Sequence, residues 1–316
     1  MLHLSGSPSP TPSVPSVRRR AARRIAALGV VLALTALVVP APTAQESSVS
    51  LVKVRTAAGV DHGRDVVWIL FLGSDARPGQ SITRSRADAI QLTGINLRTG
   101  DATMIGVPRD SYVDIPGHGS EKINAALYFG GPQLMGRAVG NLVGVQPDYV
   151  FTAGFDGFRQ MVNAVGGVTV RSRFAFSDPV RPQGYKVGPN KLNGFQAMIF
   201  ARIRKSFPRG DFDRSANQQD VMRGILAQVR GGMDEPGFME RGVLSVVRNM
   251  STDLPPSELY RLAQAGTAVE LRKLKGCVVL GGIGNVAGAS VVFPDVAQAR
   301  RIGDDARNDG RLDRGC

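Results

Sequence analysis

Arginine and aspartate residues occur together at the ends of several apolar runs of this sequence. The first such places are Asp75 with Arg77, Arg86 with Asp88, and Arg109 with Asp110. Guanidinium groups bind phosphate oxygens through paired hydrogen bonds, and Mg²⁺ beside phosphates is held by one or two carboxylates. Carboxylates set among guanidinium groups therefore predict a site that binds a pyrophosphate together with a divalent cation.

The same residue types return further along the chain, at Arg202, Arg204, Asp211 and Arg214. Arg202 and Arg204 point to one side if the backbone is extended there, because side chains alternate along a strand. Gln218 follows Arg214 by one helical turn, so both would face one ligand from a helix. Each residue alone could be a solvated surface charge or, for Asp75, the cap of a turn. The recurrence of the set is what favours a site.

Other kinds of active site find little support. The sequence contains no Gly-x-Ser-x-Gly elbow, no Walker loop and no His-Glu-x-x-His motif. Its histidines, His3, His62 and His118, have no acidic or nucleophilic companion at a telling spacing. We therefore expect no nucleophilic serine or cysteine chemistry.

The net charge of the chain indicates which kinds of binding partner to expect. The 316 residues carry a formal net charge of +13, which indicates a polyanion such as nucleic acid, anionic lipid or a phosphorylated glycan. Aromatic residues make up only 6% of the chain, and no basic helix or RNP-like motif is present. We therefore expect no nucleic-acid partner.

The N-terminal residues have the composition of a membrane-targeting region. Residues 1–24 are rich in Ser, Pro and Arg and predict a disordered basic head in the cytoplasm. Residues 25–44 carry no charge and predict a single transmembrane segment, with a cleaved signal peptide as the alternative. Residues 45–64 predict a polar linker. We therefore expect a protein that crosses the cell membrane once and has an extracytoplasmic C-terminal domain.

The two cysteines, Cys277 and Cys316, lie close to the end of the chain. In an oxidising compartment such a pair favours a disulfide that fixes the C-terminal segment to the body. A zinc site is disfavoured, because two distant thiols and three histidines lack the ligand spacing typical of zinc.

Strands are expected where apolar residues run together or alternate. The continuous apolar run over 65–72 is typical of a strand buried on both faces. Residues 88–97 alternate and then shift phase around Gly94, which predicts a β-bulge.

Helices alternate with these strands. They are expected to begin at Pro132, at an Asp156 cap, at an Asn193 cap and at Arg214. The alternation predicts an α/β fold, a layered α-β-α domain around a central mixed β-sheet over residues 65–230. Residues 231–316 are expected to be a covering segment on the same body.

Several separated motifs occur in a recognisable order. They are Leu70-Phe71-Leu72-Gly73-Ser74-Asp75-Ala76-Arg77, Arg86-Ala87-Asp88, Val107-Pro108-Arg109-Asp110, Lys122-Ile123-Asn124-Ala125-Ala126, and Leu192-Asn193-Gly194 through to Gln219. Together they resemble the LytR-CpsA-Psr family over about residues 65–230. The resemblance implies a membrane-anchored phosphotransferase that uses Mg²⁺ to move a glycopolymer from a polyprenyl-pyrophosphate carrier onto peptidoglycan.

The resemblance also implies roles for individual residues. Asp75 and Asp88 would bind the metal, and Asp75 and Arg109 would be catalytic. The residues that would bind the pyrophosphate are Arg86, Arg109, Arg202, Arg204, Arg214 and Gln218. The sequence departs from the family's Arg-Ser-Asp-Thr at Arg86-Ala87-Asp88-Ala89, and from its Arg-Gln-Gln at Asn217-Gln218-Gln219.

Two other functions stay open. A non-catalytic protein could bind polyprenyl phosphate or wall glycan with the same arginines, and a pyrophosphatase would use water as the acceptor. The residues do not separate transfer from hydrolysis, because that choice depends on the exclusion of water from a closed site.

Overall fold

The computed structural model describes residues 47–54, 65–179, 181–238 and 250–316. The expected cytoplasmic head and membrane segment therefore lie outside the described residues. Within these ranges, no helix has both the length and the apolar character needed to cross a bilayer.

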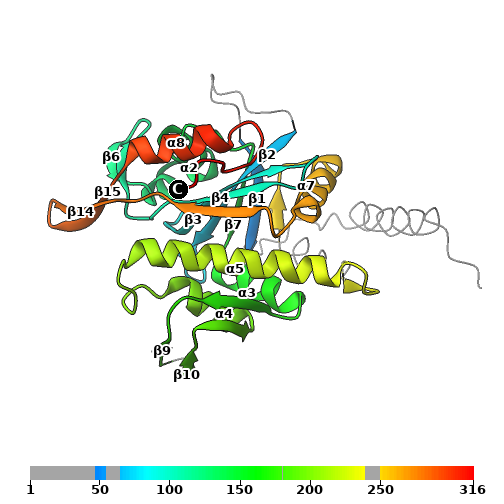
Figure 1. The fold of residues 1–316 in the computed structure, drawn as a ribbon. Coiled ribbons are helices and arrows are strands. Elements are labelled where there is room, and N and C mark those ends of the chain that lie inside the picture. The colour runs from blue at the N-terminus through cyan, green and yellow to red at the C-terminus, as the bar shows by residue number, and fades with distance from the viewer. Residues whose placement is uncertain (1–46, 55–64, 180, 239–249) are drawn as a thin grey trace, which may run out of the picture. The chain divides into compact units, whose positions relative to one another are not determined.

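A seven-stranded mixed β-sheet lies at the centre of the described chain (Figure 1). In spatial order its strands are β12 (Met250–Thr252), β1 (Val49–Lys53), β7 (Tyr149–Ala153), β2 (Val66–Ser74), β3 (Ala87–Asn96), β4 (Ala102–Gly106) and β13 (Leu274–Val278). β3 is antiparallel to β2 and β4, whereas β7 is parallel to β2 and β13 is parallel to β4. The predicted mixed sheet is confirmed.

Helices cover both faces of this sheet (Figure 1). The helices within the described residues are α2 (Ala125–Val143), α3 (Phe155–Ala164), α4 (Gly194–Arg202), α5 (Asp211–Gly232), α7 (Pro256–Ala268) and α8 (Val296–Ala306). One hydrophobic core packs Trp68 and Leu70 against α2 and α8, and a second packs Val67 and Ile69 against α5 and α7. Successive side chains of a strand point to opposite faces, so the apolar run of β2 contributes to both cores.

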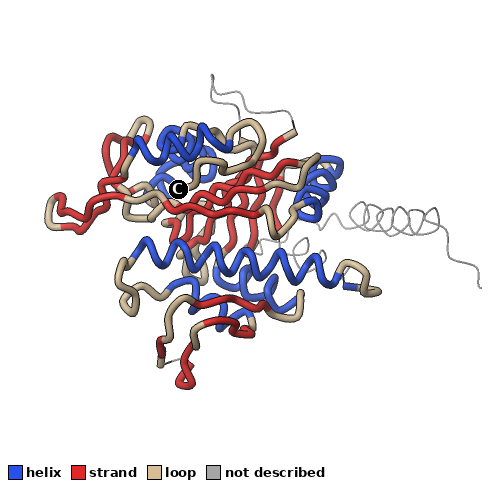
Figure 2. Tube along the Cα trace, viewed as in Figure 1, coloured by secondary structure: helices blue, strands red, loops and turns tan. Residues whose placement is uncertain are grey.

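A smaller lobe extends from the far side of α5 (Figure 2). It contains α3, α4 and two short antiparallel pairs, β8 (Val168–Ser172) with β11 (Gly188–Leu192) and β9 (Phe176–Asp178) with β10 (Arg181–Tyr185). As predicted, Asn193 caps α4, since its side chain accepts a hydrogen bond from Gln196 N at 2.9 Å. The capped helix ends at Arg202, so the position of α4 determines the position of the Arg202 side chain.

Three predicted helix starts differ from the structure. α3 begins at Phe155 with Gly154 in the N-cap position, so Asp156 lies in the first turn and does not cap. α5 begins at Asp211, ahead of Arg214. α2 begins at Ala125, and Pro132 starts its second part after a kink at Gly131, whose φ of 64° is outside the helical region. The sequence shows which residues favour turns and caps, but it does not show the backbone angles that decide where each helix begins.

Two segment boundaries also need correction. Residues 49–53, expected to be part of a linker, form β1 inside the sheet, where Val49 and Leu51 are buried. The pattern of five residues was too short to be distinguished from a linker. Residues 231–316 do more than cover the body, because β12 and β13 form the two edges of the sheet. Cys277 on β13 forms a disulfide with the last residue, Cys316.

Gly94 has a packing role and does not form the predicted bulge. It pairs with Trp68 within the regular part of the β2–β3 register, which runs from Val66↔Asn96 to Gly73↔Ala89, and the register shifts only beyond it, between Gly73 and Ser74. A Cβ atom on Gly94 would lie 2.6 Å from the Trp68 ring, which is fully buried. The glycine therefore makes room for the indole. The phase shift in the apolar pattern arises because β3 is buried on both faces, with Ile90 and Leu92 in one core and Ile95 in the other.

We expect Gly94→Ala to destabilise the fold by about 1–3 kcal/mol, the usual cost of overpacking a core. Urea denaturation followed by fluorescence measures this, because Trp68 is the chain's single tryptophan. Gly282→Ala is the matched control, since Gly282 also lies in a strand and its added Cβ would meet no neighbouring group within 4 Å. Equal stability of Gly94→Ala and the unsubstituted protein would contradict the packing role.

Candidate active site

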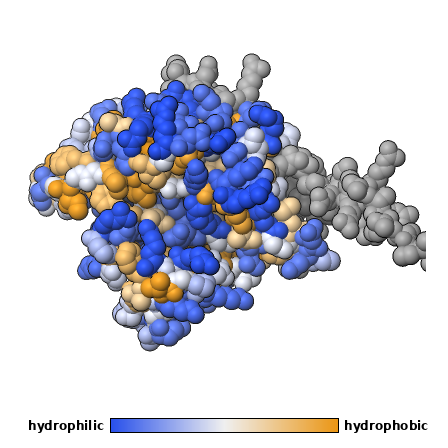
Figure 3. Space-filling view, viewed as in Figure 1, coloured by the Kyte–Doolittle hydropathy of each residue, from blue (hydrophilic) through white to orange (hydrophobic). Residues whose placement is uncertain are grey.

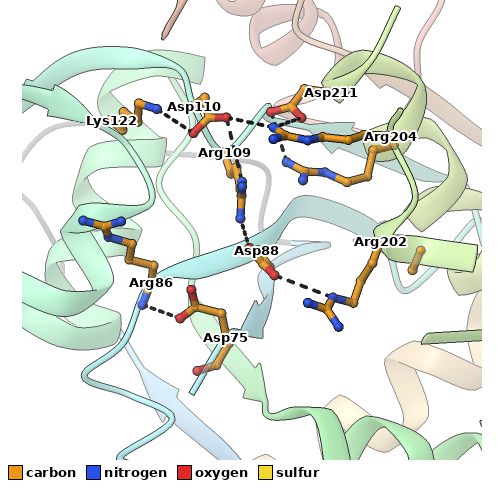
Figure 4. A network of polar contacts seen from close by, with 12 residues as sticks. Asp75, Arg86, Asp88, Arg109, Asp110, Lys122, Arg202, Arg204 and Asp211 are labelled. Atoms are coloured by element: carbon orange, nitrogen blue, oxygen red, sulfur yellow. Dashed lines mark hydrogen bonds and ion pairs between the residues drawn. The ribbon is translucent and has the colours of Figure 1, made fainter. Parts of the chain in front are cut away.

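The strand directions bring the predicted site residues together at one end of the sheet. Because β3 is antiparallel to β2 and β4, the end of β2, the start of β3 and the end of β4 are neighbours. Asp75 follows β2, Asp88 lies at the start of β3, and Arg109 is in the loop after β4. Figure 4 shows these side chains directed toward one region, which Arg202 and Arg204 approach from the opposite side.

Asp88 is the centre of the first group of contacts. Its carboxylate pairs with Arg109 through one oxygen and lies 3.9 Å from Arg202 Nε through the other. The Asp88 and Arg109 side chains are only 14% and 25% exposed, whereas Arg202 is 46% exposed. Arg109 is thus held inside the site, and Arg202 borders the solvent.

Asp110 and Asp211 are the centre of the second group. Asp110 lies 3.2 Å from Lys122 Nζ and 3.7 Å from Arg204 Nη1. Asp211 lies 3.6 Å from the same Arg204 nitrogen and 3.0 Å from Arg214 Nη2. Arg109 Nε, at 3.8 Å from Asp110, connects this group to Asp88. The two groups therefore form one network of alternating charges.

Asp75 and Arg86 form a separate pair beside this network. The Asp75 carboxylate accepts a hydrogen bond from the backbone N–H of Arg86 at 3.0 Å, and the Asp75 N–H donates to the Arg86 carbonyl. The Arg86 guanidinium is exposed and makes no hydrogen bond or ion pair within the described part of the chain. Backbone contacts therefore fix Asp75, while the Arg86 side chain stays available to a ligand.

Buried amide groups hold α5 against the sheet. Gln91 Nε2 on β3 donates to the carbonyl of Ser215 and to Gln218 Oε1, both at 3.1 Å. Gln218 Nε2 lies 3.3 Å from the Asp88 carbonyl and is almost fully buried. Gln218 was expected to face a ligand, but its contacts position the backbone of Asp88 and the helix that carries Arg214.

The surroundings of Asp110 and Asp211 shift the pKa values of these two neighbouring acids in opposite directions. Burial alone would raise the pKa of Asp110, but Arg109 and Lys122 outweigh it and lower that pKa. Burial raises the pKa of Asp211 against the attraction of Arg214, and the nearby charge of Asp110 raises it further. Asp110 is therefore the stronger acid, and a proton on the pair resides on Asp211.

The site as a whole is cationic. Its cations are Arg86, Arg109, Lys122, Arg202, Arg204 and Arg214, and its acids are Asp75, Asp88, Asp110 and Asp211. Six cations against four carboxylates leave an excess of two positive charges. A pyrophosphate diester carries one negative charge on each phosphoryl group, so the excess matches this ligand.

The acids suit a metal that also binds phosphate. Within the described residues, no three His, Cys, Asp or Glu side chains gather into a metal cage. Mg²⁺ is commonly held by one or two carboxylates, with substrate phosphates as further ligands. Asp75 follows β2 and Asp88 lies at the start of the neighbouring strand β3, so both carboxylates are at the same end of the sheet and fit this mode of binding.

The structure brings five of the predicted site residues into one network of ion pairs: Asp88, Arg109, Arg202, Arg204 and Arg214. Asp75 and Arg86 lie beside it. Asp110, Lys122 and Asp211 also belong to the network, although the resemblance to the family assigned no individual role to them. A signal was present, since Asp110 and Asp211 follow the same Arg–Asp pattern as the residues that were chosen.

A family model and several known proteins match this chain. The sequence model of the LytR_cpsA_psr family matches residues 37–307. The chain is 38% identical to the polyisoprenyl-teichoic acid–peptidoglycan teichoic acid transferase TagU of Bacillus subtilis, over 52% of each chain. It is 32% identical to the TagU of Enterococcus faecalis, over 62% of this chain and 64% of that protein. The chain thus matches less than two thirds of these relatives' lengths.

Solved structures of similar proteins share the fold. A structure described as TagT bound to LI-WTA superimposes with a TM-score of 0.64 and 25% identity, over 85% of this chain and 98% of the other. The crystal structure of B. subtilis TagU gives a TM-score of 0.58 and 28% identity, over 77% and 95% of the two chains. With the family match over most of its length, this chain belongs to the LytR_cpsA_psr family.

Proposed function

We propose that this protein is a phosphotransferase that moves a glycopolymer from a polyprenyl-pyrophosphate carrier to peptidoglycan. The observation that carries the proposal is the convergence of Arg109, Arg202, Arg204 and Arg214 around partly buried carboxylates at one end of the sheet. The printed names of the TagU relatives, which describe teichoic acid transfer to peptidoglycan, support this class of reaction.

The arginines bind and stabilise the reacting phosphates. A hydroxyl group of peptidoglycan attacks the phosphorus that carries the glycopolymer, a new P–O bond forms, and the bond to the carrier phosphate breaks. Polyprenyl phosphate leaves with the bridging oxygen. Negative charge spreads over the phosphoryl oxygens in this step, and Arg109, held in place by Asp88 and Asp110, is oriented to neutralise it.

Two acids serve the other requirements of the reaction. Asp75, whose carboxylate is fixed by the backbone of Arg86, accepts the proton of the attacking hydroxyl. Asp75 and Asp88 would hold a Mg²⁺ ion, which supplies additional positive charge to the phosphoryl oxygens when bound.

The N-terminal residues keep the enzyme beside its lipid substrate. Residues 25–44 are uncharged and follow a cluster of arginines, which is the pattern of a segment anchored with its N-terminus in the cytoplasm. The rest of the chain is then extracytoplasmic, where peptidoglycan is the available acceptor.

Removal of one arginine tests the proposal. We expect Arg109→Ala to lower kcat about 10²-fold or more, because it removes charge stabilisation that strengthens in the transition state. The measurement is transfer of a labelled glycopolymer from its polyprenyl carrier to peptidoglycan by full-length protein in membranes, with Mg²⁺. Arg98→Ala is the control, since Arg98 is 73% exposed and pairs with Asp65 outside the site.

Three outcomes of that assay would contradict the proposal. Wild-type activity in Arg109→Ala would remove Arg109 from the mechanism. Release of free glycopolymer phosphate without an acceptor would indicate a pyrophosphatase. Retention of the lipid carrier without any release of polyprenyl phosphate would indicate a binding protein.

The two neighbouring acids should respond differently to loss of charge. Because its pKa is raised, Asp211 takes up a proton before Asp110 as pH falls, and its ion pairs with Arg204 and Arg214 then weaken. Asp211→Asn resembles that protonated acid, so we expect kcat/KM of this variant to lack the decline that the step causes in the wild type as pH falls. Asp110→Asn removes the charge that orients Arg109 and Arg204 and should lower kcat/KM about tenfold or more. Profiles of kcat/KM against pH measure both effects. Equal losses and identical pH profiles in the two variants would contradict this difference between the acids.

A further inference from the structure

A charge-free hairpin extends from the body next to the candidate site. Residues 276–294 contain no charged side chain. Within this stretch β14 (Gly281–Val286) and β15 (Ala289–Pro294) pair in antiparallel register from Gly281↔Pro294 to Val286↔Ala289. Figure 1 shows the hairpin projecting away from the sheet, at the left of the view.

The hairpin and its base expose an unusual amount of apolar surface. Ile283 is 74% exposed, Phe293 46% and Leu280 40%, and Val296 at the start of α8 is 48% exposed. Figure 3 shows this apolar surface in orange at the same side of the molecule. Contiguous apolar surface of this kind marks a site of contact with a partner or a membrane.

The base of the hairpin is bonded to the loop that carries the site. Val292 N donates a hydrogen bond of 2.9 Å to the carbonyl of Asp110, and Val292 forms a parallel bridge with Ser111. The Phe293 ring meets the Tyr112 ring edge to face, with centroids 6.1 Å apart. The hairpin is therefore the outward extension of the loop that holds Arg109 and Asp110.

We propose that the β14–β15 hairpin contacts the surface of a lipid bilayer and so places the site at the level of lipid headgroups. The proposal rests on the proposed function, because the pyrophosphate of a polyprenyl carrier stays at the membrane surface. Arg109 reaches it only if the loop beside Arg109 approaches the bilayer.

Hydrogen bonding limits the depth of this contact. The outer edges of a two-stranded hairpin leave backbone N–H and C=O groups without a strand partner, and such groups are not tolerated in the hydrocarbon core. The expected position is the boundary between headgroups and acyl chains, with Ile283 directed into it.

Fluorescence quenching in vesicles tests the contact. Full-length protein with Ile283→Trp is reconstituted into phosphatidylcholine and phosphatidylglycerol vesicles that contain a lipid with a quencher near its headgroup. Val187→Trp is the matched control, because Val187 is 63% exposed on the smaller lobe. Trp68 is buried and contributes equally to both variants.

We expect lipid quenching to reduce the emission of Ile283→Trp more than that of Val187→Trp, with aqueous iodide showing the reverse order. Ile283→Trp that is open to iodide and unaffected by the lipid quencher would overturn the proposal. Protection from both quenchers would also overturn it, because a second copy of the chain would then cover the hairpin.

An activity measurement separates this proposal from the proposed function. Ile283→Asp should lower kcat/KM about tenfold or more on a carrier embedded in vesicles, the loss expected when one large apolar side chain no longer enters the bilayer. Activity on a short-chain, water-soluble carrier should be unchanged, and Ile283→Leu should retain both. Equal loss on both carriers would contradict membrane contact. Absence of transfer by wild-type protein would refute the proposed function and leave the quenching result intact.

Discussion

The mutual neutralisation of arginines and aspartates at one end of the sheet is the interaction on which the rest of the structure depends. Arg109 lies between Asp88 and Asp110, and Arg204 lies between Asp110 and Asp211. Without the carboxylates, several guanidinium groups at this spacing would repel one another in a partly buried site. The acids therefore hold the cations in place before a polyanion binds, and a phosphate can replace them as the partner of the arginines.

The fold meets this constraint through strand direction and helix placement. The antiparallel pairs β2–β3 and β3–β4 bring residues far apart in sequence to one end of the sheet. The amide network of Gln91, Ser215 and Gln218 then fixes α5, so that Asp211 and Arg214 complete the site from the other side. The hairpin β14–β15 is bonded to the same loop, which links the chemistry to the outer surface of the molecule.

Much of the fold and of the candidate site could be predicted from short sequence patterns, and the wrong predictions have physical causes. The buried strand β2 and the Asn193 cap have strong local signals, and both are as predicted. β1 and β13 are each five residues long and are stabilised by distant strands, so their place in the sheet depends on tertiary contacts. Gly94 was read as a bulge because the sequence does not show that Trp68 lies opposite it. Lys122 was missed as a site residue because it lies outside the Arg–Asp pattern and reaches Asp110 only through folding.

A crystal structure of the protein with a short-chain polyprenyl pyrophosphate and Mg²⁺ would test the central claim most directly. The account predicts that phosphoryl oxygens lie within hydrogen-bond distance of Arg109, Arg202 and Arg204, and that some of their ion pairs with Asp88 and Asp110 open. A pyrophosphate bound elsewhere, with these ion pairs intact, would contradict it.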